Sequence, residues 1–332
     1  MEAATRQHSH CLGRPLNLTA TSPPAPGPVN LPVWACVVCY HVRAEALQPL
    51  LQSLRPQVGR ILLIDNSPGF SPTVAGLADE SLTYVPMGSN VGTAGALNEA
   101  WRLALAGEAC AMISFDQDSL PAPDLVACLM STWHQLISQG KPVAVIGPGL
   151  FDPRSGRPTR ILLPVTCRRR HQLPSGSEPI QADHLISSGS LITREAYLAV
   201  GPFLNGLFLD YVDIEWSLRA RAMGLQAYVQ PASAMVHTIG DEIIEFAGRA
   251  ISVHKPVRSY LLIRNHMLLW RLPTTSFCWL IRDLIQINIK LLVLLLLRPN
   301  GVQRWKWVIR GAWHGMLRRD GPPRDRADHR KT

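Results

Sequence analysis

An apolar run that stops at two carboxylates constrains the fold of this chain most strongly. Residues 109–115 are largely apolar, Asp116 and Asp118 follow with one residue between them, and such a run predicts a buried central strand. Because ligands bind beyond the carboxyl ends of strands in open α/β sheets, we expect the two carboxylates at a binding edge. Hard oxygen ligands suit Mg²⁺ or Mn²⁺, which usually share their coordination with a substrate's phosphates. Taken alone, the same residues also fit a plain polar turn, so the interpretation depends on the rest of the chain.

Predicted strands and helices alternate over residues 33–148. The predicted strands are residues 33–40, 60–64, 82–85, 109–115 and 143–146, and the predicted helices are residues 43–54, a segment that ends near residue 106, and residues 123–138. The first of these helices carries leucines at helical spacing, which is typical of an amphipathic helix. The alternation predicts an α/β fold in which a mixed, mostly parallel sheet has helices on both faces.

The pattern changes beyond residue 148. Residues 149–182 are rich in proline and glycine and predict an irregular loop, in which the basic run 168–171 is interpreted as a solvated charged segment. The following segments predict a short helix from Arg194, a helix in the second half of residues 208–224, and a strand at residues 227–229.

Composition and charge exclude some classes of protein. The 332 residues are 47% hydrophobic and 17% charged, which is enough apolar material for one large α/β domain or two small ones. The net charge is +9, but residues 298–332 hold ten Lys and Arg against three Asp, a local charge of +7. The remainder is close to neutral, which argues against a nucleic-acid-binding surface on the globular part.

The cysteines and the first residues indicate a reducing, cytoplasmic setting. Cys36 and Cys39 form a C-x-x-C pattern within a predicted strand, where residues three apart point to opposite faces. We therefore expect buried apolar cysteines rather than a disulfide or a shared metal. Residues 1–32 are rich in Pro, Ser, Thr and Ala and have no apolar segment of signal-peptide type, so they predict a disordered leader.

A second apolar region lies near the end of the chain. Residues 257–272 predict a helix, and residues 276–297 are long and apolar but interrupted by Arg282, Asp283 and Lys290. The clean part is short for a membrane span, so an amphipathic helix in the membrane plane fits better. The tryptophans and cations of residues 305–319 suit an anionic membrane surface. A helical lid packed on the domain explains the same pattern, and the two interpretations stay open.

Polar groups also follow other predicted strands. They are Asp65 and the Ser188–Gly189 turn, and they are followed along the chain by an acid cluster at a helix start, Asp210, Asp213 and Glu215, and by His237. Such a set suits transfer of a group from a diphosphate: a metal neutralises the departing phosphate, and a separate carboxylate removes the proton of an attacking hydroxyl. Each residue alone also fits a structural role, as a turn, a helix cap or a first-turn acid.

The motifs, in their order along the chain, resemble those of family 2 glycosyltransferases with the GT-A fold. Within that family, the chain is most similar to bacterial rhamnosyltransferases that build lipopolysaccharide O-antigen or other surface polysaccharide. The resemblance covers roughly residues 33–270 and rests on Tyr40, Ile64-Asp65-Asn66, Asn90-x-Gly92-x-x-Gly95-x-x-Asn98, Asp116-x-Asp118-Ser119, Ser188-Gly189, Asp213-x-Glu215-Trp216-x-x-Arg219-Ala220-Arg221 and His237-x-x-Gly240-Asp241.

The resemblance implies a role for each matched residue. It implies that Asp213, rather than Asp210, is the catalytic base. It implies that Asp116, Asp118 and His237 bind a divalent Mg or Mn ion. The residues implied to bind the nucleotide-sugar are Tyr40, Asp65, Asn90, Gly92, Asp116, Ser188 and Gly189. The first strand ends Cys39-Tyr40-His41 where the family more often has Thr-Tyr-Asn, so a contact from His41 stays open.

The resemblance also implies a reaction and a cellular site. We expect an inverting transfer of L-rhamnose from dTDP-L-rhamnose to a glycan or lipid-linked glycan, at the inner face of the cell membrane. The alternatives are a UDP-hexose donor or a non-catalytic scaffold. A nicotinamide dehydrogenase is disfavoured because no G-x-G-x-x-G follows the first strand. The expected division is a leader (1–32), a GT-A domain (33–270), C-terminal helices (271–318) and a disordered basic tail (319–332).

Overall fold

The structure is a computed structural model, and it describes residues 32–164, 170–238, 240, 242–246, 249–298 and 300–323. Almost all of the predicted leader, the first half of the basic run 168–171, Asp241 of the last motif and the end of the tail lie outside the described residues.

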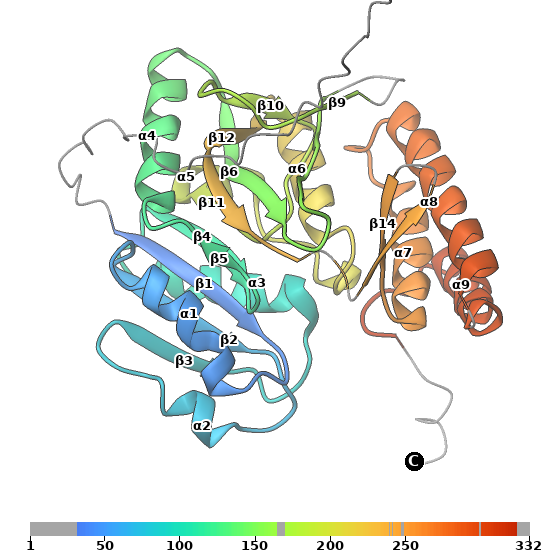
Figure 1. Ribbon diagram of the computed structural model, residues 1–332, viewed down its shortest axis with the longest axis horizontal. Coiled ribbons are helices and arrows are strands. Elements are labelled where there is room, and N and C mark those ends of the chain that lie inside the picture. The colour runs from blue at the N-terminus through green and yellow to red at the C-terminus, as the bar shows by residue number, and fades with distance from the viewer. Residues whose placement is uncertain are drawn as a thin grey trace, which may run out of the picture. The chain divides into compact units, whose positions relative to one another are not determined.

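A ten-stranded mixed sheet forms the centre of the fold (Figure 1). The strands along its main path are β10 (Ile180–Ala182), β12 (Gln226–Val236), β6 (Val143–Asp152), β11 (Leu191–Thr193), β4 (Ala111–Asp116), β1 (Val33–Cys39), β2 (Arg60–Asp65) and β3 (Leu82–Pro86), in that spatial order. Strands β4, β1, β2 and β3 are parallel, as are β6 and β12, whereas β11 runs antiparallel between β4 and β6. The predicted mostly parallel α/β sheet is confirmed.

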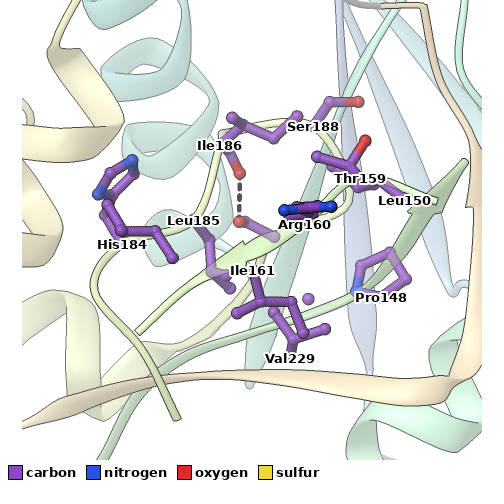
Figure 2. Close-up of a pocket in the computed structure, with 13 residues that line it drawn as sticks. Pro148, Leu150, Thr159, Arg160, Ile161, His184, Leu185, Ile186, Ser188 and Val229 are labelled. Carbon is purple, nitrogen blue, oxygen red and sulfur yellow. Dashed lines mark hydrogen bonds between the residues drawn. The ribbon is translucent and has the colours of Figure 1, made fainter. Parts of the chain in front are cut away.

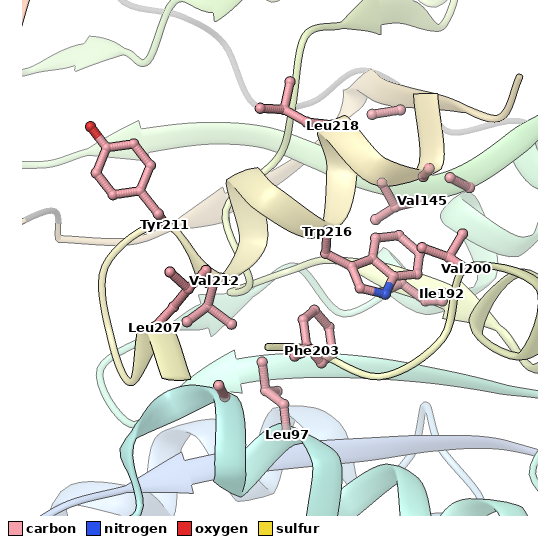
Figure 3. Packing of buried hydrophobic residues seen from close by; sticks show 14 of the residues in the cluster. Leu97, Val145, Ile192, Val200, Phe203, Leu207, Tyr211, Val212, Trp216 and Leu218 are labelled. Atoms are coloured by element: carbon pink, nitrogen blue, oxygen red, sulfur yellow. The ribbon is translucent and has the colours of Figure 1, made fainter. Parts of the chain in front are cut away.

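Helices cover both faces of this sheet, which is why its central strands are apolar on both sides. One core cluster includes residues of α3 (Gly92–Ala106), α5 (Arg194–Val200) and α6 (Val212–Ala222), and the other includes residues of α1 (Ala44–Leu54) and α4 (Leu125–Ser138). Figure 3 shows Leu97, Phe203 and Trp216 packed together in the first cluster. Cys36 belongs to the first cluster and Cys39 to the second, so the predicted opposite orientation is confirmed.

The prediction that residues 149–182 are irregular was wrong in part. Strand β6 continues to Asp152, and short strands follow at β7 (Arg157–Pro158), β8 (Ile161–Leu162), β9 (His171–Gln172) and β10. Two-residue strands are defined by hydrogen bonds between distant segments, so their sequences show no local period. The strand predicted at residues 227–229 is likewise longer and reaches Val236, where its end pairs with β5 (Leu120–Pro121).

Three C-terminal helices pack on one another and on the sheet domain. They are α7 (Pro256–Leu269), α8 (Phe277–Leu297) and α9 (Gly301–Met316), and they follow a hairpin of β13 (Glu242–Phe246) and β14 (Arg249–Val253). The inner face of α8, with Trp279, Leu280 and Ile287, belongs to the same core cluster as Trp216 of α6. Within the described residues, none of the helices combines the length and apolar content needed to cross a bilayer.

Candidate active site at the carboxyl ends of the strands

Three side chains that are far apart in the sequence form a candidate metal centre. Asp116 ends β4, Asp118 lies two residues later, and His237 directly follows β12. One ligand atom from each residue lies within 4.8 Å of the other two. His237 Nε2 is 3.7 Å from an Asp116 carboxylate oxygen, and His237 Nδ1 is 3.8 Å from an Asp118 carboxylate oxygen. The pairing of β5 with the end of β12 brings these segments together.

The donor set of this cluster fits one divalent ion. Two carboxylates and an imidazole are suitable ligands for Mn²⁺, and the carboxylates also suit Mg²⁺. The side chains of Asp116 and Asp118 keep 46% and 48% of their surface exposed, whereas His237 is buried. An ion held here would therefore keep coordination positions open to a ligand from solution. The hydroxyl of Thr238 donates a hydrogen bond to Asp118 Oδ2, which orients that carboxylate.

Ser119 connects this cluster to the Ser188–Gly189 turn. The Ser119 hydroxyl lies 3.2 Å from His237 Nδ1 and 2.6 Å from the Ser188 hydroxyl. Ser188 Oγ also accepts a hydrogen bond from the Asp116 N–H. In the tautomer in which Nδ1 donates to Ser119, His237 Nε2 keeps its lone pair on the side of Asp116, where it can bind an ion.

We expect Ser119→Ala to weaken Mn²⁺ binding by about 10-fold, because partners that orient a metal-binding histidine typically contribute this much. Titration of the free ion by electron paramagnetic resonance measures the affinity directly. Ser138→Ala removes an exposed hydroxyl from α4 and serves as the control. An unchanged Mn²⁺ affinity in Ser119→Ala would exclude the proposed orienting role.

Asp213 is held beside the same centre by the turn that contains Ser187 and Ser188. It lies in the first turn of α6, and its Oδ2 accepts the Ser187 N–H at 3.0 Å. The next residue, Ser188, is bonded to the backbone of Asp116. Desolvation by the surrounding protein is the main cause that raises the pKa of Asp116, although part of its side chain reaches solvent. His237 opposes this shift, and the charges of Asp118 and Asp213 add to it. Asp213 is therefore within electrostatic range of the candidate metal centre.

The surroundings of Asp213 suit a proton acceptor. Burial raises the pKa of its carboxyl above the ordinary value, although nearby His184 and the N–H groups of Ile214 and Ser187 lower it in part. A carboxylate with a raised pKa binds a proton more readily than a solvated one, which improves a general base.

The neighbouring acids of this segment have other partners. Asp210 forms an ion pair with Arg258 at 2.6 Å. Glu215 is buried and accepts two hydrogen bonds from Arg219, one turn further along α6. The geometry therefore favours Asp213 over Asp210 as the base.

Two of the predicted nucleotide contacts follow β1 and β2. The side chain of Tyr40 is 44% exposed, and its N–H donates to Oε1 of Gln117, the residue between the two metal-cluster carboxylates. Asp65 is only 2% exposed, and its carboxylate accepts hydrogen bonds from the Ser67 N–H and the Tyr84 hydroxyl. Tyr40 is accessible to a ligand, whereas contact between Asp65 and a nucleobase stays a prediction.

Asn90 and Gly92 lie at the start of α3, beside the end of β2. Asn90 Oδ1 accepts hydrogen bonds from the Gly92 N–H and from Asn66 Nδ2, and Asn66 Oδ1 accepts the Val91 N–H. Gly92 has φ +77°, and a Cβ atom there would lie 2.2 Å from the Phe208 carbonyl oxygen. Gly92 therefore has a packing role, because it lets α3 approach the segment that precedes α6 closely.

The sequence did not reveal Asp183, a buried carboxylate that ties α6 and α8 to this region. It accepts hydrogen bonds from Arg221 at 2.6 Å and from the Trp279 indole at 2.8 Å, and it lies 3.1 Å from Nδ1 of His184. Burial opposes ionisation, but the interactions with His184 and Arg221 together hold the pKa of Asp183 well below its ordinary range. These partners are up to 96 residues away in the chain, so no local motif marks them.

A mainly apolar pocket opens beside the same turn (Figure 2). It has a volume of about 150 Å³ and is lined by Arg160, Ile161, His184, Leu185 and Ser188 among others. Since Ser188 borders it and the adjacent Ser187 binds Asp213, the pocket adjoins the candidate base.

A sheet of this topology with carboxylates and an imidazole at its edge is the arrangement of a nucleotide-sugar transferase. The family model "Glycosyl transferase family 2" matches residues 35–201, and the chain belongs to this family. It is also 29% identical over 284 residues to the dTDP-rhamnosyl transferase RfbF of Shigella flexneri, over 84% of this chain and 93% of RfbF. The expected family and the expected glycosyltransferase class are thereby confirmed.

Solved structures share the fold. The structure of S. aureus TarS 1-349 aligns with a TM-score of 0.51 at 12% identity, over 86% of this chain and 80% of that one. GalNAc-T7 with UDP, GalNAc and Mn²⁺ aligns with a TM-score of 0.50 at 15% identity, over 78% of this chain, which spans about half (54%) of the GalNAc-T7 chain.

Proposed function

We propose that this chain transfers L-rhamnose from dTDP-L-rhamnose to a hydroxyl of a glycan or lipid-linked glycan, with inversion and with the help of a divalent ion. The observation that carries the reaction type is the convergence of Asp116, Asp118 and His237 beside Asp213. The similarity to the RfbF rhamnosyl transferase over most of both chains supports the donor.

In the proposed reaction, which is a single displacement at the anomeric carbon, each of these residues has a separate role. Asp116, Asp118 and His237 would hold the divalent ion, whose charge would stabilise the departing diphosphate. Asp213 accepts the proton of the acceptor hydroxyl as that oxygen forms its bond to the anomeric carbon and the bond to the diphosphate breaks. Attack opposite the leaving group inverts the configuration at that carbon. We place Tyr40, Asp65, Asn90 and Gly92 around the nucleoside.

The donor is tested by comparing dTDP-L-rhamnose, UDP-galactose and UDP-GlcNAc with one acceptor extract and following sugar transfer by mass spectrometry. The expected result is a kcat/KM at least about 10²-fold higher for dTDP-L-rhamnose, since buried polar groups that miss their partner cost this much or more in specificity. Preference for either UDP-sugar would overturn the choice of donor and leave the transferase class intact.

We also propose that α8 and α9 lie on a membrane surface, where a lipid-linked acceptor would be found. Exposed apolar residues recur every three or four positions on α8 at Ile281, Ile285, Ile289, Leu292 and Leu296, and on α9 at Val302, Trp305, Ile309, Trp313 and Met316. Each set forms one stripe along its helix. Cations at Lys306, Arg310, Arg318 and Arg319 accompany the second stripe, and this combination is typical of helices that bind anionic lipid in the interfacial plane.

We expect the protein to sediment with phosphatidylglycerol-containing vesicles, and the variant Trp305→Ser/Trp313→Ser to bind them at least about 10-fold more weakly, because each tryptophan buries a large apolar area. Leu198→Ser/Met223→Ser removes exposed apolar side chains from another surface and is the matched control. Equal vesicle binding by the tryptophan variant and the control would contradict the membrane proposal.

A further inference from the structure

A second, strongly cationic pocket lies between α7, α8 and α9. It has a volume of about 50 Å³, and its charged and titratable lining residues are Asp210, His254, Arg258, Lys290 and Arg304. The pocket adjoins the segment that carries the candidate base, because its lining includes Asp210, which precedes Asp213 in the chain. None of the steps assigned above uses Lys290, Arg304 or His254.

The positive charge in this pocket exceeds the negative charge. Arg258 is paired with Asp210, the carboxylate of the lining. Lys290 forms no hydrogen bond or ion pair with any residue that the structure describes. Arg304 is 3% exposed and donates to the Ser259 hydroxyl and the His254 carbonyl, but its Nε has no partner among the described residues. The lining therefore carries three cations against one anion.

The pKa of His254 is consistent with the excess of positive charge in this pocket. Burial, together with the positive charges of Arg258, Lys290 and Arg304, lowers the pKa of its imidazole to about 3. Burial likewise lowers the pKa of Lys290. Cations that are partly buried and lack a counter-charge are unfavourable, and an anion that enters the pocket reduces this cost.

We propose that this pocket is a phosphate-binding site in which Lys290 and Arg304 hold a phosphate group of a diphosphate ester. Guanidinium and ammonium groups are the side chains that recognise phosphate. The volume suits a group of a few atoms, since one water takes up about 30 Å³ in the liquid. The proposal rests on the proposed function, because the two sources of a diphosphate ester are then the nucleotide of the donor and the lipid carrier of the acceptor.

Inorganic pyrophosphate in the presence of EDTA tests the site without the metal centre. We expect pyrophosphate to raise the Tm of the wild-type protein and to give a measurable Kd by calorimetry, and we expect Lys290→Met to bind it at least 10-fold more weakly. Without ligand, Lys290→Met should unfold at a higher temperature than the wild-type protein, because an unpaired charge in a partly buried position is removed. Lys141→Met makes the same charge change at an exposed residue before β6, outside every site proposed above, and should alter neither property.

Farnesyl diphosphate and dTDP distinguish the two sources. If farnesyl diphosphate binds protein that is already saturated with Mn²⁺ and dTDP, and Lys290→Met loses this binding, the pocket takes the carrier phosphate of the acceptor. If dTDP excludes farnesyl diphosphate and Lys290→Met weakens dTDP binding, the pocket takes the donor diphosphate. If wild-type protein binds no diphosphate in EDTA, or Lys290→Met binds equally well, the site is excluded. These measurements do not require sugar transfer, so their failure leaves the proposed transferase activity untested and intact.

Discussion

Replacing Asp213 by asparagine is expected to lower kcat by about 10³-fold while the fold and the affinity for Mn²⁺ and dTDP stay close to wild type, because a positioned general base typically contributes 10²- to 10⁴-fold. Asparagine keeps Oδ1, which accepts the Ile214 N–H in the first turn of α6, but it replaces Oδ2, which accepts the Ser187 N–H, by an amide group that cannot accept. A small decrease in Tm is therefore expected, and it is measured alongside the rate. Single-turnover transfer separates the chemical step from donor binding, which calorimetry measures. Glu195→Gln makes the same change in the exposed first turn of α5 and is the matched control.

The pH dependence gives a second test of the same residue. Asp213 has to be ionised to accept a proton, and burial raises its pKa. The rate should therefore fall, as the pH is lowered, at a pH above the ordinary aspartate pKa of about 4, and this acid limb should be absent from the residual activity of Asp213→Asn. Retention of more than a tenth of the wild-type kcat in a folded variant would remove Asp213 as the base.

Asp118→Ala is expected to lower kcat/KM by at least about 10²-fold, since loss of one group that stabilises the charge of a leaving group has this effect. It should also weaken Mn²⁺ binding, and the stimulation of transfer by Mn²⁺ should shift to higher concentrations. Because Asp118 is 48% exposed, we expect little change in Tm. The control Asp124→Ala removes another exposed carboxylate, from the residue that precedes α4.

For Asp118→Ala, the dependence of transfer on the divalent ion has to be measured together with the activity. The account predicts that EDTA abolishes transfer by the wild-type protein and that added Mn²⁺ restores it. Wild-type kcat/KM in Asp118→Ala, or full activity of the wild-type protein in excess EDTA, would show that Asp118 does not act through an ion.

The sequence predicted those parts of the fold that have a strong local pattern. The apolar run before Asp116 is β4, and the amphipathic leucines of residues 43–54 become the buried face of α1. Periodicity was sufficient because central strands and covering helices are long and are buried on defined faces. The short strands between Arg157 and Ala182 have no such pattern, because bonds between distant segments define them.

For the candidate site, too, the sequence predicted only what a local motif marks. Asp116, Asp118 and His237 were predicted from motifs, and the structure brings them together. Roles that depend on contacts at long range could not be predicted. Asp183 gathers partners from α6 and α8, and Lys290 becomes notable only because three helices enclose it. The sequence also left the lid and the membrane helix as equal alternatives. The structure shows α8 with one face in the core and an exposed apolar stripe, and the membrane proposal rests on that stripe.

The central claim is that one site holds the ion, the diphosphate and the base. A crystal structure with Mn²⁺ and dTDP, with the ion located by its anomalous scattering, tests it most directly. The account predicts a single Mn²⁺ bound by Asp116, Asp118 and His237, in contact with the diphosphate, with the carboxylate of Asp213 facing the terminal phosphate. Mn²⁺ and dTDP bound away from these residues, or Asp213 turned away from the nucleotide, would contradict it.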